Sequence, residues 1–250
     1  MSITITGIDG LPRVKPGDDL PALLVDAVRR VPLELQNGDV LVVCQKVVSK
    51  AEGRIADLTK VEASEFAKAI AATTTGKDPR AIEVILRETN RIVKMERGHL
   101  IVETGPGWVC ANAGVDESNN LGPDTVILLP LDPDASAEAI RSHVNQVAGV
   151  DVAVIVSDTF GRPWREGLLD VALGVAGMDP FLDERGRHDL NGRELHHTVL
   201  AAADALAAAA GMVMRKGAGV AAACIRGYQF TPGAGGGHRL VRARELDLFR

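Results

Sequence analysis

Continuous apolar runs alternate along this chain with segments whose apolar residues recur every three or four positions. Residues 40–44 and 152–156 are almost entirely Val, Leu, Ile and Ala, which is typical of strands buried on both faces of a sheet. Between such runs, Ile140 and Val144 lie one helical turn apart and predict the inner face of a helix that Ser136 caps. The alternation of strands and helices predicts the α/β class.

The same pattern predicts the other elements. Helices are expected over residues 20–31, 64–73, 78–89 and 199–210, and strands over residues 2–6, 92–95, 100–103, 108–111, 125–129 and 220–225. Residues 178–195 are polar and rich in Arg, Asp and Gly, and they predict a surface loop or arm. The glycine-rich residues 232–238 predict a flexible loop.

Composition and charge narrow the class of protein. The 250 residues are 46% hydrophobic and carry a net charge of -5, so the basic face of a nucleic-acid-binding protein is not expected. Residues 1–10 lack a basic region followed by an apolar core, so a signal peptide is not expected there, and the weakly polar run 201–214 is too short to be expected to span a membrane. Cys44, Cys110 and Cys224 each lie within an apolar run and predict reduced core residues of a cytoplasmic protein.

The segment SDTFGRPWREG, residues 157–167, concentrates the candidate chemistry. It follows the apolar run 152–156, and Asp158 and Thr159 offer hard oxygen ligands. Arg162 and Arg165 add fixed positive charge beyond a turn. A strand that ends in a carboxylate, a hydroxyl and two arginines predicts a site for a metal ion and a phosphorylated substrate.

A second acidic cluster follows another predicted strand. Asp116, Glu117, Ser118 and Asn119 lie together, and taken alone they are as typical of a turn or a helix cap as of a binding site. Because Asp158 occupies a similar place after its own strand, the two clusters together indicate a Mg²⁺ or Mn²⁺ site.

Cationic and glycine-containing segments could complete such a site. Lys46 and Lys50 follow the buried run 40–44, where they could neutralise phosphate or form a solvated face. Gly10 to Pro12 could present backbone groups to a nucleotide, although the local sequence favours a simple turn. The chain has no G-x-x-x-x-G-K-[ST] phosphate loop, and the adjacent His196 and His197 would face opposite ways in a strand.

Six segments, in this order, resemble the coenzyme F420:γ-glutamyl ligase family: GIDGLP, QKVVSKAEGR, ANAGVDESN, LDPDASA, SDTFGRPWREG and DLNGREL. The resemblance covers residues 4–227, and the ordered set is far more specific than any one motif. It implies an enzyme that uses GTP and Mg²⁺ or Mn²⁺ to add L-glutamate to the lactate end of the deazaflavin coenzyme F420 precursor. K⁺ is a further candidate ion.

The resemblance also implies roles for individual residues. Asp116, Asp158 and Thr159 match metal ligands, and Asp116, Asp158 and Lys50 are the expected catalytic residues. Arg215 stands where some members carry an acidic or amide metal ligand, so that loop either holds no second metal or supplies its charge differently. The residues expected at the nucleotide are Gly10, Leu11, Pro12, Arg13, Gln45, Lys46, Lys50, Asn119, Met214, Lys216, Gly217 and Gly219.

The implied architecture is an unusual mixed α/β fold, distinct from Rossmann and P-loop folds, in an intertwined homodimer. Residues 1–250 are expected to form one domain, with two interlocked subdomains as the alternative, and without the C-terminal nitroreductase-like domain of some relatives. The sequence leaves two other functions open: a metal-dependent phosphotransferase or phosphatase, and a nucleotide- or coenzyme-binding module without catalysis.

Overall fold

A mixed five-stranded sheet forms the centre of the computed structural model, which describes residues 2–73, 76–96, 98–118, 122–215, 217 and 219–248. The strand order is β1 (Thr4–Ile8), β12 (Ala222–Arg226), β2 (Val40–Cys44), β8 (Ala153–Arg162) and β9 (Arg165–Ala176). The pair β2–β8 is parallel, and the other neighbours are antiparallel. The α/β class expected from the sequence is confirmed.

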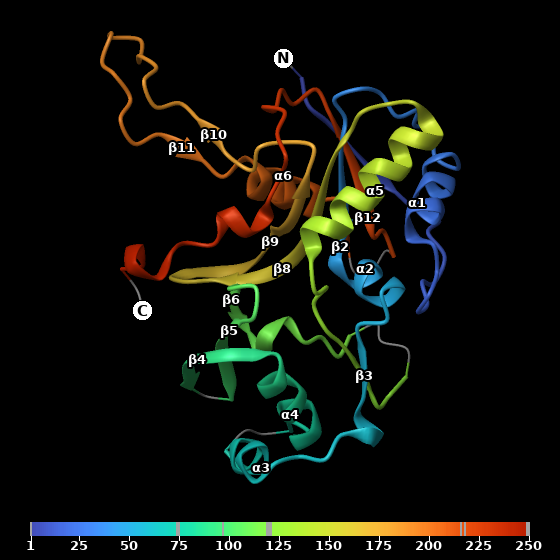
Figure 1. Ribbon diagram of the computed structural model, residues 1–250, viewed down its shortest axis with the longest axis vertical. Coiled ribbons are helices and arrows are strands. Elements are labelled where there is room, and N and C mark those ends of the chain that lie inside the picture. Colours follow the sequence, from blue (N-terminus) through green and yellow to red (C-terminus); the bar gives the residue numbers. More distant parts are fainter. Residues whose placement is uncertain are drawn as a thin grey trace.

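Helices cover both faces of this sheet (Figure 1). Leu41 and Val43 pack towards α1 (Leu20–Val28) and α5 (Pro133–Ala148). Val40 and Val42 pack on the opposite face, towards α6 (Ala202–Gly211). Successive strand residues point to opposite faces, so a strand buried on both sides must be apolar at every position.

A small lobe, defined here as the elements from β3 to β7, lies beside the carboxyl ends of β2 and β8 (Figure 1). It has its own apolar clusters, one around Ile82 and Leu100 and one around Leu58 and Val126. Its elements are β3 (Ile55–Asp57), α3 (Glu65–Ala72), α4 (Pro79–Arg87), β4 (Thr89–Glu96), β5 (His99–Thr104), β6 (Val109–Ala111) and β7 (Thr125–Ile127).

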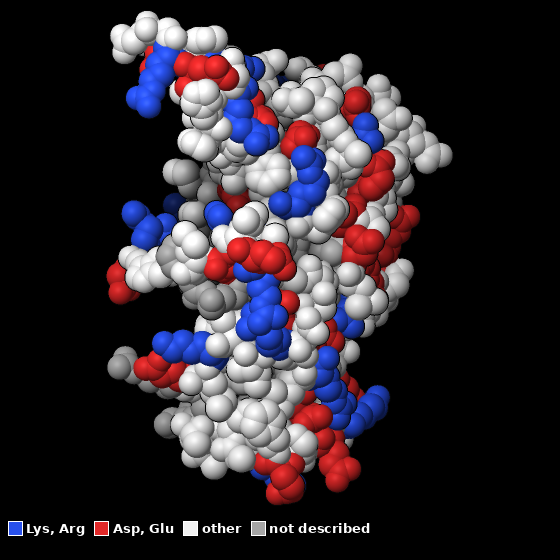
Figure 2. Space-filling view, turned by 60° about the vertical axis from the view of Figure 1, so that its left-hand side comes forward, with Lys and Arg blue, Asp and Glu red and all other residues white. Residues whose placement is uncertain are grey.

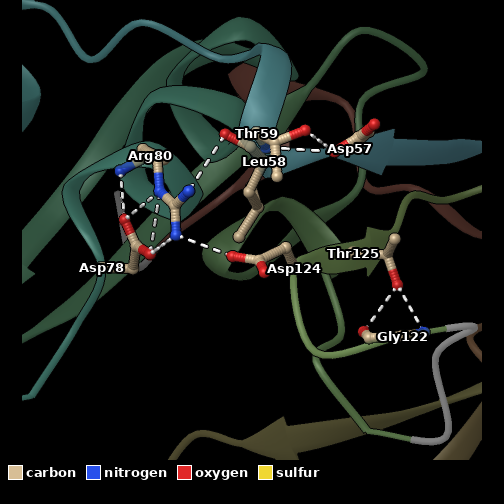
Figure 3. A network of polar contacts seen from close by, with 8 residues as sticks. All are labelled: Asp57, Leu58, Thr59, Asp78, Arg80, Gly122, Asp124 and Thr125. Atoms are coloured by element: carbon tan, nitrogen blue, oxygen red, sulfur yellow. Dashed lines mark hydrogen bonds and ion pairs between the residues drawn. The ribbon is translucent and has the colours of Figure 1, made fainter.

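Arg80 ties the parts of this lobe together (Figure 3). Its guanidinium binds Asp78, the N-cap of its own helix α4, at 2.7 Å, and reaches Asp124 at 3.0 Å. Its third partner is the carbonyl of Leu58, which accepts a bond at 3.4 Å. Asp124 directly precedes β7, so this planar cation fixes the end of the segment that leads from Asp116 into that strand.

Two projections leave the compact body (Figure 1). The ends of β8 and β9 form a hairpin beyond the sheet, with Trp164 77% exposed at its turn. The second projection is an arm that starts and ends in the short pair β10 (Leu182–Asp183) and β11 (Val199–Leu200). The surface arm expected for residues 178–195 is confirmed for its outer part, because residues 185–194 are all exposed.

Several expected boundaries were wrong. Asp132, not Ser136, caps α5, because its carboxylate accepts the N–H of Ala135 at 2.9 Å. The helix expected over 199–210 begins at Ala202, after β11. The short helix α2 (Gln45–Ala51) and the strand β9 were not predicted. Short 3₁₀ turns occupy Leu58–Lys60, Asn112–Gly114, Gly237–Leu240 and Arg244–Leu246.

The loop expected to be flexible is packed in place. The N–H of Gly237 donates to Asp134 at 2.6 Å, and the N–H of Gly236 donates to the carbonyl of Val175 at 3.0 Å. A Cβ on Gly235 would lie 2.0 Å from that same carbonyl oxygen. The glycines therefore allow a close approach to β9, and the prediction of flexibility was wrong for residues 235–237.

In the part of the chain that the structure describes, no helix combines the length and the apolar character needed to cross a membrane.

Candidate functional site

A cavity of about 610 Å³ opens at the carboxyl edge of the parallel pair β2–β8. The ladder between these strands ends at Cys44 and Ser157. After Cys44 the chain turns into α2, and after Ser157 it continues along β8. The cavity is lined by the N-terminal segment 11–15, helix α2, residues 157–159, Asp170, and residues 214–215 and 219–221. Five stretches distant in sequence thus meet where α/β sheets commonly bind ligands.

The charges that line the cavity are mainly positive. Five of the described lining side chains are cationic and two are carboxylates. The seven are Arg13, Lys15, Lys46, Lys50, Arg215, Asp158 and Asp170. Such an excess of positive charge in a concave site favours a polyanionic ligand such as a nucleoside triphosphate.

Lys46 connects the central sheet to the small lobe at the cavity wall. Its side chain is only 7% exposed, and its Nζ lies 2.6 Å from Asp116 Oδ2 and 2.6 Å from Ser118 Oγ. Burial disfavours the charge of Asp116, but hydrogen bonds from Lys46 and Ser118 outweigh it and hold the pKa of that carboxyl below its usual value. Asp116 is therefore ionised at neutral pH.

Lys50 lies one helical turn after Lys46 on α2 and also lines the cavity. Burial lowers the pKa of Lys50, and the charges of Lys46 and Arg13 lower it further, while Asp116 acts in the opposite direction. Lys46, Lys50, Arg13 and Asp116 therefore share one electrostatic environment. An anion bound there would be attracted by all three cations.

Asp158 and Thr159 follow the last residue of β8 that pairs with β2. Thr159 lies opposite Asp170 of β9, and its hydroxyl donates to Asp170 Oδ1 at 2.6 Å. The negative charges of Asp158 and Asp170 both act on the nearby thiol of Cys44. All three oxygen-bearing side chains line the cavity.

Cys44 lines the cavity without the character of a nucleophile. Burial raises its pKa to about 11, and Asp158 and Asp170 act in the same direction. Burial likewise raises the pKa of Cys110 and of Cys224 to about 12. All three cysteines are free thiols, as expected from the sequence, and are protonated at neutral pH.

Most of the residues that the sequence indicated are brought together here. The described ones that line the cavity are Leu11, Pro12, Arg13, Lys46, Lys50, Asp158, Thr159, Met214 and Gly219. Asp116 adjoins the cavity through Lys46. Asn119 and Lys216 lie outside the described residues.

Other indicated residues lie apart from the cavity lining. Gln45 is fully buried and its side-chain oxygen accepts the Ser49 hydroxyl at 2.8 Å. Gly10 borders the lining segment, and its carbonyl accepts a bond from Arg30. Gly217 is exposed and outside the lining.

Arg162 and Arg165 do not line the cavity either, although the sequence made them candidates for phosphate contact. Strand β8 continues to Arg162, about 13 Å beyond Asp158 at the usual rise per residue. Arg165 begins the returning strand β9 at the same end of the hairpin. These arginines therefore lie towards the hairpin tip.

Sequence reasoning missed Asp170 and Lys15. Asp170 is the single charged residue in the run from Leu168 to Met178, and a lone carboxylate in an apolar strand was the available signal. Its relation to Thr159 depends on the pairing of β8 with β9, which the sequence pattern did not indicate.

The donor set of the cavity wall fits a hard divalent cation. No three His, Cys, Asp or Glu side chains among the described residues are grouped closely enough to enclose a metal by themselves. Asp158 and the Thr159 hydroxyl nevertheless supply hard oxygens at a cavity suited to phosphates, and Asp116 adjoins it. Mg²⁺ commonly binds through one or two carboxylates, with substrate phosphates and waters as its other ligands.

Comparisons with known proteins show the family of this chain. A family model described as F420-0:Gamma-glutamyl ligase matches residues 10–227. A protein of Methanothermobacter thermautotrophicus named Coenzyme F420:L-glutamate ligase is 45% identical over the full length of both chains. Proteins of the same name are 46% identical in Methanopyrus kandleri, over 95% of this chain and 94% of the relative, and 43% identical in Haloarcula marismortui, over 98% and 95%. The matched region contains every stretch that lines the cavity.

Proposed function

The chain belongs to the F420-0:gamma-glutamyl ligase family, and we propose that it joins L-glutamate to the lactyl carboxylate of a deazaflavin coenzyme F420 precursor. GTP is the proposed energy source. The observation that carries this proposal is the cationic cavity at the carboxyl edge of β2–β8, with Asp158 and Thr159 on its wall. Further γ-linked glutamates are added if the product can re-enter the site.

The proposed chemistry activates a carboxylate, which is a poor electrophile at neutral pH. A carboxylate oxygen of the precursor attacks the γ-phosphorus of GTP, the bond to the β-phosphate oxygen breaks, and GDP leaves. The amine of glutamate, having lost its ammonium proton, then attacks the resulting acyl phosphate. An amide bond forms, the C–O bond to phosphate breaks, and inorganic phosphate is released.

The residues of the cavity serve mainly to position and neutralise charge, as is general in phosphoryl transfer. Lys50 and Arg13 would contact the phosphates, and Lys46 would hold Asp116 in place. Asp116, Asp158 and Thr159 would hold Mg²⁺ or Mn²⁺, which when bound would balance phosphate charge. K⁺ is a further candidate ion, and Arg215 would contribute a fixed positive charge from the loop after α6.

A homodimer is part of the proposal. The hairpin and the arm expose large apolar side chains, among them Trp164, Leu168, Leu190 and Leu200. Leu190 lies in the exposed outer part of the arm, residues 185–194, and its side chain is fully exposed in the described chain. Exposed apolar projections of this kind commonly bury themselves in a second subunit.

Mass spectrometry of a reaction with the unglutamylated coenzyme, L-glutamate, GTP and Mn²⁺ or Mg²⁺ tests the function. We expect a product heavier by one or more glutamyl units, with GDP formed in equal amount. GDP formed without glutamylation would favour a phosphotransferase or phosphatase. Binding of nucleotide or coenzyme without any turnover would favour a non-catalytic module.

A further inference from the structure

Asp170 lines the cavity and has no role in the proposed chemistry described above. It lies on β9 opposite Thr159, and its side chain lines the cavity beside Asp158. Within the described part of the chain, Asp170 takes part in no ion pair, although five cationic side chains line the same cavity. Its negative charge therefore serves something other than a salt bridge.

The contact that Asp170 makes is with a hydroxyl. Thr159 Oγ1 donates its only proton to Asp170 Oδ1 at 2.6 Å, within the range of a charge-assisted bond. A hydroxyl has one donor and two acceptor lone pairs. Because the proton is engaged by Asp170, the lone pairs are what Thr159 can offer to the cavity.

The packing around Asp170 holds the carboxylate in place. A Cβ on Gly211, at the end of α6, would lie 2.6 Å from Asp170 Oδ2. The absence of a side chain at Gly211 therefore makes the room that Asp170 occupies. Earlier on α6, Asp204 accepts the N–H of Ala172 at 2.9 Å and fixes β9 two residues from Asp170.

We propose that Asp170 is a positioning residue that orients the Thr159 hydroxyl, so that its lone pairs face the divalent cation of the proposed reaction. This inference rests on the proposed function, because it assumes that the cavity binds a metal with GTP. Outer partners that orient metal ligands typically change metal affinity or activity by about 10–100-fold when removed.

Binding of Mn²⁺ alone, followed by electron paramagnetic resonance of the free ion, tests the inference without relying on turnover. Asp170→Ala removes both the acceptor and the charge, and we expect its Mn²⁺ affinity to fall by about 10–100-fold. Asp170→Asn keeps an acceptor oxygen for Thr159, so its affinity is expected to fall less. Asp26→Ala is the matched control, because it removes a 54% exposed carboxylate on α1, away from the cavity.

A double-mutant cycle with Thr159→Val separates positioning from an independent role. If Asp170 acts through Thr159, the double variant binds Mn²⁺ no more weakly than the weaker single variant. Additive losses, or an Asp170→Ala variant with wild-type affinity, would overturn the inference. A variant that raises only the KM for glutamate would instead place Asp170 at the acceptor amine.

The test also separates this inference from the proposed function. If the wild type and Asp170→Ala bind Mn²⁺ equally well, the proposed metal site is supported and only the role of Asp170 is refuted. A wild-type protein that binds no Mn²⁺, with or without GDP, overturns the metal role and this inference together. Near-ultraviolet circular dichroism of each variant confirms that its fold is retained.

Discussion

At the scale of single residues, the cavity is organised by charges that are brought close together and partly withdrawn from water. Lys46 neutralises Asp116 across the junction of the sheet and the small lobe. Lys50 has no such carboxylate at contact distance among the described residues, and its pKa is lowered. In the proposed function, the two lysines of α2 therefore have different roles: Lys46 would hold Asp116 in place, and Lys50 would be available to an anion.

Replacing Asp158 tests the proposed metal site. Asp158→Asn keeps the shape of the side chain and removes its charge, so we expect kcat to fall by at least about 100-fold with the fold intact. Steady-state kinetics and circular dichroism check this, with Asp26→Asn as the control at a surface helix. Wild-type activity in Asp158→Asn would remove this residue from the metal role.

The lowered pKa of Lys50 predicts a pH dependence. As pH rises through that pKa, which lies below the usual 10.5, Lys50 loses its charge and kcat/KM for GTP falls. Lys50→Arg keeps its charge at higher pH, because a guanidinium has a pKa above about 12. We therefore expect the alkaline limb of the variant to lie at higher pH than that of the wild type.

The pH profile of kcat/KM for the wild type is divided by that for Lys50→Arg, so that ionisations of the nucleotide itself cancel. Identical alkaline limbs in the two proteins would show that Lys50 does not carry the charge that the nucleotide senses.

At the scale of elements, the close packing of α5 against β9 depends on Gly174. A Cβ on Gly174 would lie 2.0 Å from the carbonyl oxygen of Pro133, in the first turn of α5. Asp134 of the same turn also accepts the N–H groups of Val175 and Gly237. The start of α5 is thus fixed to β9 and to the glycine-rich loop by contacts that tolerate no added atom.

We expect Gly174→Ala to lower the free energy of unfolding by about 3 kcal/mol, because a backbone must move to admit the methyl group. Gly161→Ala in the same hairpin is the control, since a Cβ added at that position would have nothing within 4 Å of it. That variant is expected to change stability by less than about 0.5 kcal/mol. Urea denaturation of both measures the difference, and equal midpoints would contradict the packing argument.

At the scale of the whole molecule, charged side chains are spread over the body and the projections alike. Figure 2 shows Lys and Arg interspersed with Asp and Glu over the face in view, with no continuous basic area there. The hairpin and the arm also present leucines and Trp164. These side chains form the apolar surface that a partner could cover on the two projections.

Light scattering tests the proposed homodimer. We expect a mass of twice the 26.4 kDa of one chain. Leu168→Glu places a charge on the hairpin, where the native side chain is 67% exposed, and is expected to shift the protein towards monomer. Val147→Glu on α5, away from both projections, should leave the mass unchanged. A monomeric wild-type protein would contradict the proposal.

The sequence by itself determined the class of the fold and indicated half of the residues that line the cavity. Buried strands such as β2 are apolar throughout because both faces are covered, so they are visible without a structure. Asp158 and Lys50 were found because each follows such a strand closely, and Asp116 because an acidic cluster follows a shorter strand. Their order along the chain also carried the resemblance to the family.

Only the tertiary structure decided which contacts form between segments that are distant in the sequence. The bond from Thr159 to Asp170 requires the register of β8 with β9, and the bridge from Lys46 to Asp116 requires the small lobe to dock on α2. The packed glycines of 235–237 looked flexible because composition does not reveal that a neighbouring backbone fills the space a side chain would need. Local propensity acts over a few residues, whereas these contacts form between groups that only the folded chain brings together.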